Sequence, residues 1–224
     1  MLKIDTHIHT SFSKDSEMSL EALHQKCLKT GLNCIAITDH NTIEGALRFK
    51  SIASFEVIVG EEINTIQGEI TGLFLKEKIP AGLSAIDTVK NIKSQGGLVS
   101  IPHPFDIFRS SVIKLDALYE VLPHVDIIEG FNARNTFHFS NKKAEKLAKD
   151  HNILTSGVSD AHTAYEVGRT YMEMPEFDGT AKGFLNSLNS RTIYANKVSP
   201  LIHILTTFTK TKKKFLIRWE KIKG

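Results

Sequence analysis

Histidine and carboxylate side chains recur along this chain, each time directly after a short apolar run. The chain begins MLKIDTHIHTSFSKDS, in which Asp5, His7, His9 and Asp15 follow the run 2–4. Imidazole and carboxylate groups are ligands that borderline divalent ions such as zinc, manganese and iron accept. One such stretch is weak evidence, because HIH occurs by chance. If it forms one wall of a metal site, comparable ligands should follow other strands.

The same arrangement returns later in the chain. The side chains that follow the later apolar runs are Asp39 and His40, Glu61 and Glu62, His103, Glu129 and Asn132, and Asp160 and His162. In parallel α/β folds the carboxyl ends of the strands hold the active site, and in a barrel they converge on one mouth. The joint placement therefore predicts a metal site, although each motif alone is weak.

Helix-length segments with apolar residues at roughly helical spacing separate the apolar runs. The expected strands are 2–4, 34–38, 56–60, 70–75, 98–101, 125–130 and 153–159, and the expected helices are 19–31, 42–53, 84–97, 114–124 and 141–152. Ser19 and Ser84 suit helix N-caps, and Gly31 and Gly96 suit helix C-termini. Repeated strand–helix units predict one parallel α/β domain, either closed as a barrel or open and doubly wound.

The composition is that of an ordinary globular protein. Of the 224 residues, 41% are hydrophobic and 24% are charged, and the net charge is +3, so the overall charge gives no argument for nucleic acid. Cys27 and Cys34 are too few for a disulfide framework and are expected to be buried or partly buried thiols. No signal-peptide pattern and no transmembrane-length apolar run is present, so we expect a cytoplasmic protein.

Taken together, five motifs resemble a known family. The stretches DTHIHTSFSKDS, AITDHN, GEEI, IPHP and SDAH have the order and context of the PHP (polymerase and histidinol phosphatase) family of metal-dependent phosphoesterases. The resemblance implies a distorted (β/α)7 TIM-like barrel, with two or three divalent ions (Zn, Mn or Fe) at its C-terminal mouth. It further implies hydrolysis of phosphate esters by metal-activated water. We assign residues 1–199 to this domain and 200–224 to a basic C-terminal tail.

The resemblance also implies which residues hold the ions. One ion would take His7, His9, Glu62 and Asp160; a second would share Glu62 and add His103 and a ligand from the strand near 125–132; a third would take Asp15, His40 and His162. Glu62 is preferred to Glu61 because it directly precedes Ile63, as in the family's G-x-E-I pattern. On the strand near 125–132 both Glu129 and Asn132 are open, and Asn132 is our candidate ligand.

Other residues are expected to support these ligands or the substrate. Asp5 and Asp39 precede ligand histidines and are predicted to accept a ring N–H, which fixes the tautomer. Arg134 and Arg169 lie just beyond strand ends and could clamp a phosphate, although loop arginines are often plain surface charge. Asp160 and His162 are the candidate catalytic residues, because one of them could manage the proton of the leaving group.

The sequence leaves the substrate open among a nucleotide, a short oligonucleotide and a small phosphorylated metabolite. Phe137 and Phe139 either pack a helix or form an aromatic rim that stacks a base. The basic stretch 209–224 is either a solvated face or a contact for nucleic acid or an acidic membrane surface.

Two rival classes remain. One is a non-catalytic regulatory or nucleic-acid-binding module on the same scaffold, and the near-complete set of ligands argues against it. The other is a metal-dependent amidohydrolase, which would use a strand-borne lysine, and no lysine stands at these strand ends.

Overall fold

The computed structural model describes residues 1–199 and 202–223. Within these residues the strands form one sheet in the order β7-β6-β5-β4-β3-β2-β1-β8-β9. The strands are β1 (Leu2–Ile8), β2 (Cys34–Ile37), β3 (Glu56–Thr65), β4 (Gly68–Leu73), β5 (Leu98–Ile101), β6 (Ile127–Asn132), β7 (Leu154–Val158), β8 (Tyr171–Met174) and β9 (Thr192–Tyr194). The sheet carries the parallel pairs β1–β2, β2–β3, β5–β6 and β6–β7, as expected for an α/β protein.

The sheet curls until its first and seventh strands meet. The chain just beyond β7 bridges the end of β1 through Ile8 and Ala161, and the His9 amide donates to the Ala161 carbonyl at 2.8 Å. The hairpin between β3 and β4 reverses the chain, so β4 is antiparallel to both of its neighbours. The prediction of a distorted TIM-like barrel is thus confirmed: the barrel is nearly closed, and β4 interrupts its parallel order.

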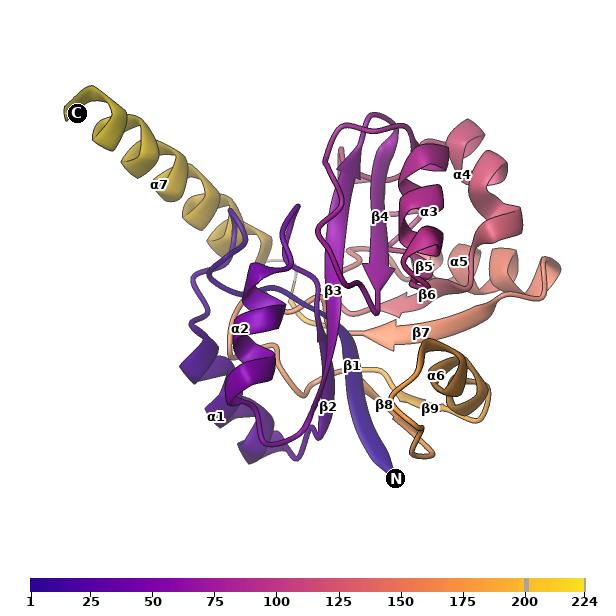
Figure 1. Ribbon diagram of the computed structural model, residues 1–224. Helices are drawn as coiled ribbons and strands as arrows, with labels where there is room; N and C mark the ends of the chain where they lie inside the picture. Colours follow the sequence, from indigo (N-terminus) through magenta and orange to yellow (C-terminus); the bar gives the residue numbers. More distant parts are fainter. Residues whose placement is uncertain (200–201, 224) are drawn as a thin grey trace.

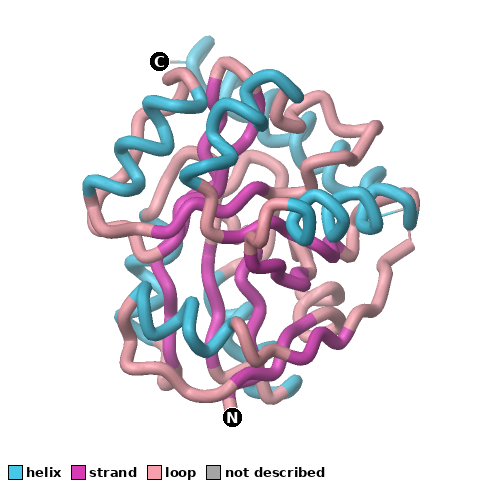
Figure 2. Tube along the Cα trace, turned by 90° about the vertical axis from the view of Figure 1, so that its right-hand side faces the viewer, coloured by secondary structure: helices cyan, strands magenta, loops and turns pink. Residues whose placement is uncertain are grey.

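Helices surround this sheet, as the tube drawing shows (Figure 2). They are α1 (Leu20–Thr30), α2 (Glu44–Ile52), α3 (Ala85–Ser94), α4 (Leu115–Val121), the short 3₁₀ turn η1 (Leu122–His124), α5 (His138–Asp150), α6 (Ala181–Leu188) and α7 (Ile202–Lys223). The Ser19 hydroxyl accepts from the Ala22 amide and the Ser84 hydroxyl from the Asp87 amide, so both predicted caps are confirmed. Gly31 and Gly96 have φ of 73° and 76°, as their predicted positions require.

Side chains on the two faces of the strands contribute to two apolar cores. Ile35 joins the core that packs under the outer helices, where it meets Leu23 of α1 and Phe49 of α2. The next residue, Ala36, joins the second core, which Phe184 of α6 also enters. Successive strand residues point to opposite faces, so one strand supplies both cores. Cys27 and Cys34 are buried free thiols, as predicted, and burial raises the pKa of Cys27 to about 12.

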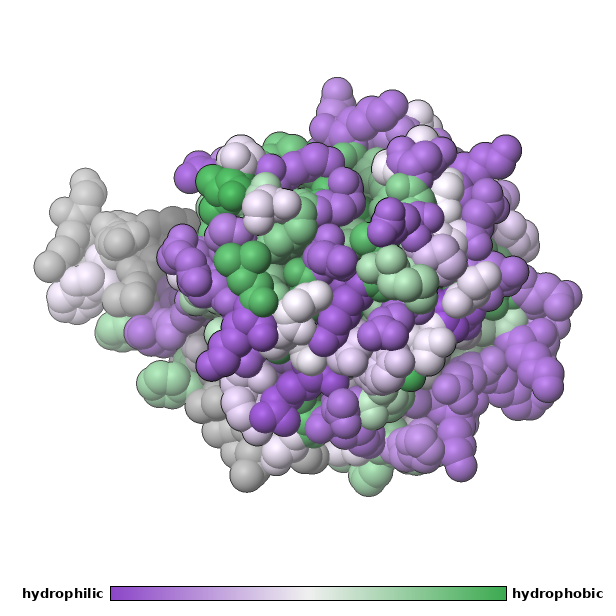
Figure 3. All heavy atoms as spheres, turned by 90° about the horizontal axis from the view of Figure 1, so that it is seen from below, coloured by the Kyte–Doolittle hydropathy of each residue, from purple (hydrophilic) through white to green (hydrophobic). Residues whose placement is uncertain are grey.

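The strand ends define the two ends of the molecule. The N-terminus lies at the lower end in Figure 1, and hydrophilic residues cover most of that end when it is seen from below (Figure 3). At the upper end α7 extends outward from the body (Figure 1). Within the described ranges no helix is both long and apolar enough to cross a membrane. The expected boundary at Pro200 lies outside the described residues, so the division into 1–199 and a tail stays a prediction.

Three details differ from expectation. Strand β3 runs on to Thr65, so Glu61 and Glu62 lie inside a strand and not after its end. Helix α5 begins at His138, earlier than the expected 141. The elements β8, α6 and β9 were not predicted, because they are short and their apolar patterns are brief.

Candidate metal centre

Glu62 is the hub of a buried cluster of histidines at the upper end of the barrel. Its Oε2 lies 3.3 Å from His9 Nε2, 3.5 Å from His7 Nε2 and 3.2 Å from His40 Nδ1. Its Oε1 lies 3.1 Å from His103 Nε2. The carboxylate therefore touches imidazoles from both halves of the sheet, and it is only 1% exposed.

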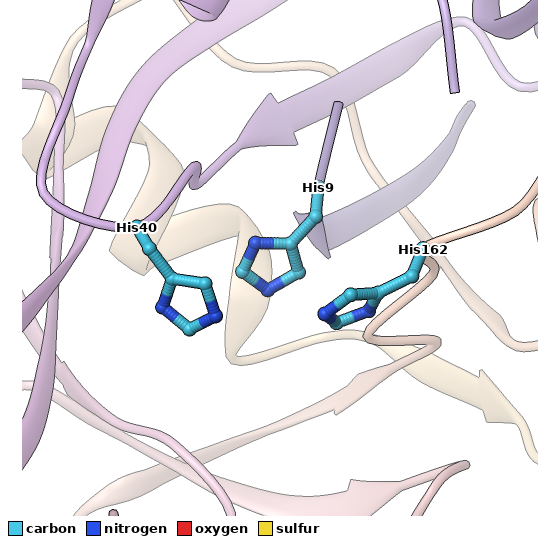
Figure 4. A group of neighbouring side chains, drawn as sticks. All are labelled: His9, His40 and His162. Carbon is cyan, nitrogen blue, oxygen red and sulfur yellow. The ribbon is translucent and has the colours of Figure 1, made fainter. Parts of the chain in front are cut away.

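His9 also belongs to a group of three imidazoles that face one another (Figure 4). Its ring centroid lies 4.6 Å from that of His40 and 4.1 Å from that of His162. One nitrogen from each ring can be chosen so that all three lie within 4.8 Å of one another. Asp15 lies between the outer two rings, with its oxygens 3.3 Å from His40 Nε2 and 3.5 Å from His162 Nε2.

Asp160 completes the side of the cluster formed by β1. Its Oδ1 lies 3.7 Å from His7 Nε2 and 3.5 Å from His9 Nε2. The structure thus brings together His7, His9, Glu62 and Asp160, the four residues expected to share one ion. It also brings together the expected trio of Asp15, His40 and His162.

The neighbouring glutamates on β3 have opposite surroundings. Glu62 faces the cluster, while Glu61 turns the other way and accepts the amide N–H of Ile79 at 2.8 Å. Alternation of side chains along a strand forces this division. The structure therefore places Glu62, and not Glu61, among the histidines, and burial raises the pKa of Glu61 to about 7.

Hydrogen bonds behind the first two histidines set their ring orientations. His7 Nδ1 donates to Glu129 Oε1 at 2.5 Å. His9 Nδ1 lies 3.1 Å from the Ser13 hydroxyl, which in turn donates to Asp39 at 2.7 Å. With both Nδ1 atoms protonated, the two Nε2 atoms face each other at 2.9 Å with their lone pairs directed into the cluster. That arrangement suits nitrogen atoms that ligate a cation.

These contacts revise the roles expected for Asp5 and Asp39. Asp5 accepts main-chain N–H groups of His7 and Ser159, at 3.3 and 3.2 Å, and not a ring N–H. Asp39 reaches His9 only through Ser13. Asp5 therefore fixes the backbone between β1 and β7, and burial raises its pKa to about 7.

The side-chain amide of Asn132 also lies at the cluster, and its role as a ligand stays a prediction. Its amide NH2 donates to Glu129 Oε2 at 2.8 Å and to Asp160 Oδ2 at 3.2 Å, while its carbonyl oxygen accepts the Arg134 amide. An amide in this orientation presents donors to the cluster, and a metal needs an oxygen lone pair. Glu129, the other residue left open on this strand, accepts the His103 main-chain amide at 2.9 Å. A further carboxylate near the His103 ring belongs to Glu69 of β4, whose Oε2 lies 3.8 Å from His103 Nε2.

The carboxylates give the cluster an excess of negative charge. Burial lowers the pKa of His7, but the carboxylates of Glu129, Asp160 and Glu62 outweigh it and hold that pKa well above its ordinary value. Burial likewise lowers the pKa of His9, yet Asp160 and Glu62 raise it to about 9. These shifts report a strongly negative potential at the imidazoles, and a divalent cation would lie in the same potential.

Some of the candidate donor atoms also lack a hydrogen-bond partner within the described part of the chain. Oδ1 of Asp160 and Oδ1 of Asp15 are buried and make no hydrogen bond among the described residues, although an imidazole nitrogen lies 3.5 Å from each. Buried polar atoms are nearly always satisfied, so such a concentration at one place needs a ligand. Mixed imidazole and carboxylate donors suit zinc, manganese or iron. The residues present therefore fit the divalent ions that the sequence predicts.

Strained backbone accompanies this cluster. His103 and Asp160 have φ of 31° and 54°, a region that non-glycine residues rarely adopt. Each such residue costs about 1–3 kcal/mol and persists where the surroundings hold it in place. Both side chains reach the cluster because of this turn of the main chain, which is a feature of functional sites.

A cavity of about 330 Å³ opens beside the cluster. Asp15, His40 and His162 line its inner part, and Arg109 and Arg134 also line it. Arg109 pairs with Asp160 Oδ2 at 2.5 Å, and Arg134 Nη1 lies 2.6 Å from His162 Nδ1. Two guanidinium groups at a pocket lined by metal-type ligands suit a doubly charged phosphate.

Arg169 does not join this cavity. Its side chain is exposed, its Nε donates to the Tyr165 carbonyl at 3.0 Å, and its guanidinium lies 3.8 Å from the centre of the Tyr165 ring. The expectation that it clamps phosphate is therefore not supported by its position. The second arginine at the cavity is Arg109, and no motif in the sequence pointed to it.

Helix α7 forms part of the cavity wall. Thr206, Thr207 and Lys210 line it, and the Thr206 hydroxyl accepts from Arg134 at 3.2 Å. Further along, the Lys213 ammonium donates to the carbonyls of Ser11, Ser13 and Ser16 at 2.8, 2.7 and 2.6 Å. That loop carries Asp15, so the basic helix holds a wall of the site in place.

The fold and this cluster define a class: a distorted α/β barrel with a candidate multi-ion centre at its mouth. Comparison with known proteins identifies the family, because the sequence profile of the PHP domain matches residues 5–194. The chain belongs to the PHP domain family. It is 36% identical over 200 residues to the uncharacterized protein MJ0417 of Methanocaldococcus jannaschii, covering 85% of this chain and 81% of that protein.

Solved structures share the fold at lower identity. A two-domain protein of Bacteroides vulgatus that contains a predicted PHP-like metal-dependent phosphoesterase superposes with a TM-score of 0.66 at 20% identity; the match covers 87% of this chain and 65% of that one. The lesion-specific endonuclease EndoQ of Pyrococcus furiosus superposes with a TM-score of 0.58 at 15% identity, covering 89% and 59%. This chain therefore spans roughly two thirds or less of the length of these two structures.

Proposed function

We propose that this protein is a metal-dependent phosphoesterase whose centre is the cluster around Glu62. The observation that carries the proposal is the contact of one buried carboxylate with imidazoles of His7, His9, His40 and His103, beside a cavity lined by two arginines. The family membership and the predicted metal-dependent phosphoesterase among the structural relatives support it.

The ligand set we propose follows the contacts. His7, His9, Glu62 and Asp160 would hold one ion, and Asp15, His40 and His162 would hold another. His103, with Glu62 and Glu69, would hold a third where three are bound. When bound, such ions neutralise the phosphate oxygens and lower the pKa of a bound water. Zinc, manganese and iron are the candidates that this donor set allows.

The residues of the chain itself bind and orient the ester. Arg109 and Arg134 bring positive charge to the cavity that they line. Arg109 already contacts Asp106 and Asp160, and Arg134 already contacts His162 and Thr206. Each guanidinium would therefore bind a phosphate through its charge and through the N–H groups that these contacts do not use. Burial raises the pKa of Asp160, but Arg109 and His7 outweigh it and hold that pKa well below its ordinary value, so the carboxyl is ionised. Burial and Arg134 lower the pKa of His162 to about 3, so its imidazole is neutral. Neither expected catalytic residue carries a proton to give at neutral pH, so we propose that positive charge in the site stabilises the leaving oxygen.

The cavity limits the substrate to a phosphate group with a modest leaving group at its mouth. A nucleotide, the end of a short oligonucleotide and a small phosphorylated metabolite all meet that limit. The endonuclease among the structural relatives acts on nucleic acid, which keeps the oligonucleotide among the candidates.

The test begins with elemental analysis of the purified protein. Chelation should then abolish hydrolysis of phosphomonoesters, and one of zinc, manganese or iron(II) should restore it after the chelator is removed. Full activity in metal-free protein would refute the mechanism. A protein that retains its metals and binds phosphate or nucleic acid, yet cleaves nothing across a panel of esters, would favour the non-catalytic module.

A further inference from the structure

Three phenylalanine rings form an exposed row beside the cavity. Phe108 is 66% exposed, and Phe137 and Phe139 are each 42% exposed. The ring centroids of Phe108 and Phe137 lie 5.5 Å apart, and those of Phe137 and Phe139 lie 5.3 Å apart at an interplanar angle of 18°. Of the two alternatives for Phe137 and Phe139, helix packing or an aromatic rim, their position favours the rim, because the two rings stack on each other and are partly exposed. Contiguous exposed aromatic surface marks a binding site more often than scattered single residues do.

The two ends of the row have different surroundings: Phe139 contacts a lysine, and Phe108 lies at the cavity. Lys143 of α5 places its ammonium 5.7 Å from the centre of the Phe139 ring, a cation–π contact. Phe137 contacts both other rings. Phe108 lies at the other end, and it is the member of the row that lines the cavity. A flat ligand in the cavity would therefore meet the ring of Phe108 first.

The loop that carries Phe108 is fixed by a buried aspartate. Asp106 is 2% exposed; its Oδ1 accepts the Phe108 amide at 3.1 Å and its Oδ2 accepts Arg109 Nε at 3.2 Å. One carboxylate thus holds both the ring-bearing residue and the guanidinium that reaches Asp160. Because Phe108 and Arg109 both line the same cavity, one ester bound there could contact the ring and the guanidinium together.

We propose that this row is a stacking platform for a planar aromatic ring in the leaving group, with Phe108 as its contact face. The inference rests on the proposed function and names a substrate class for it: a phosphate ester of an aromatic group, such as a nucleobase or a phenyl ring. The charges agree with such a ligand, since Arg109, Arg134, Lys14 and Lys210 line the same cavity and favour its phosphate.

The test compares esters with and without a ring in the metal-loaded protein. Phe108→Leu keeps an apolar side chain and removes the flat ring, and the residue is exposed, so the fold should not depend on it. We expect the variant to raise KM about 10-fold for adenosine monophosphate or phenyl phosphate, because stacking on an aromatic side chain contributes on that order. KM for glycerol phosphate should stay within about 2-fold. A larger effect on adenosine monophosphate than on phenyl phosphate would identify the ring as a nucleobase.

Two controls make the outcome decisive. Tyr119→Leu removes a ring that is 57% exposed on α4 and should change no substrate. Equilibrium dialysis of adenosine monophosphate and glycerol phosphate measures the same preference without turnover. Suppose that the wild-type protein cleaves no ester but binds the aromatic ligand in preference to glycerol phosphate, and that Phe108→Leu abolishes this preference. The proposed function would then fail, and the stacking platform would still be supported. Equal effects on both ligands, or none on either, would overturn the platform.

Discussion

The two sides of the candidate site are built differently. The ligand side, which we define as His7, His9, Glu62 and Asp160, is carried by β1, β3 and the end of β7, and each side chain is at most 1% exposed. The wall side, which we define as Phe108, Arg109 and the α7 residues 206–213, is carried by a loop and a terminal helix. Phe108 and Lys210 on that side are exposed to solvent.

The ligand side is the rigid part of the site, and the wall side is the part that can adapt. The ligand side needs donor atoms held within a fraction of an ångström, and buried strands backed by Glu129, Ser13 and Asp39 supply that rigidity. The wall side meets the variable part of a substrate, and loops tolerate change without disturbing the core. Changes on the ligand side should therefore remove activity, while changes on the wall side should tune it.

The largest effect is expected at the hub. Glu62→Gln should lower kcat/KM by more than about 100-fold and reduce bound metal, since even changes behind a ligand cost 10- to 100-fold. Glu61→Gln is the matched control, because Glu61 is its neighbour on the opposite face of β3 and keeps an oxygen for the Ile79 amide. Metal content by elemental analysis and steady-state kinetics would measure both. Similar losses in the two variants would contradict the division between the faces.

The next largest effect, on metal affinity, is expected at Asp39, which contacts a ligand histidine through Ser13. Asp39→Asn removes one acceptor from the path to His9 through Ser13 and should weaken metal binding about 10- to 100-fold. The measurement is a metal titration of chelator-treated protein. Asp116→Asn on the outer helix α4 should leave the titration unchanged. An unchanged affinity in Asp39→Asn would show that the ring of His9 is held without this path.

A moderate effect is expected on the wall side. Lys213→Met removes three hydrogen bonds to the loop that carries Asp15 and should cost about 1–2 kcal/mol of unfolding free energy, because solvent screens part of a charged contact at the surface. Activity should fall about 3- to 10-fold, because the loop that positions Asp15 loosens while the strand-borne ligands stay in place. Lys214→Met, an exposed neighbour, is the control. Thermal unfolding and kinetics would test this, and a complete loss of activity would contradict the distinction between the two sides.

The smallest effect is expected at Arg169. Its guanidinium lies over Tyr165, away from the cavity, so Arg169→Ala should keep kcat/KM within about 2-fold, as surface substitutions usually do. Arg134→Ala is the informative partner, since Arg134 lines the cavity and should raise KM for every phosphate ester. A larger effect at Arg169 than at Arg134 would overturn the assignment of the phosphate-binding arginines.

The candidate residues of the ligand side could be selected from the amino-acid sequence alone. The apolar runs before His7, His40, His103 and Asp160 predict strands, and parallel strands bring their carboxyl ends to one mouth. Local signals also predicted the caps Ser19 and Ser84, because a cap depends on residues only a few positions away.

The remaining contacts of the site depend on how distant segments of the chain pack together. Glu69 reaches His40 and His103 because the β3–β4 hairpin reverses the chain, and Arg109 reaches Asp160 across a loop. Asn132 turns its donors inward because its own main-chain neighbourhood occupies its oxygen. Lys213 meets the loop around Ser13 some two hundred residues earlier in the chain. Short-range sequence patterns determine which face of a helix or strand is apolar. Contacts between distant segments depend instead on how whole helices and strands pack, and the local spacing of residues does not encode this packing.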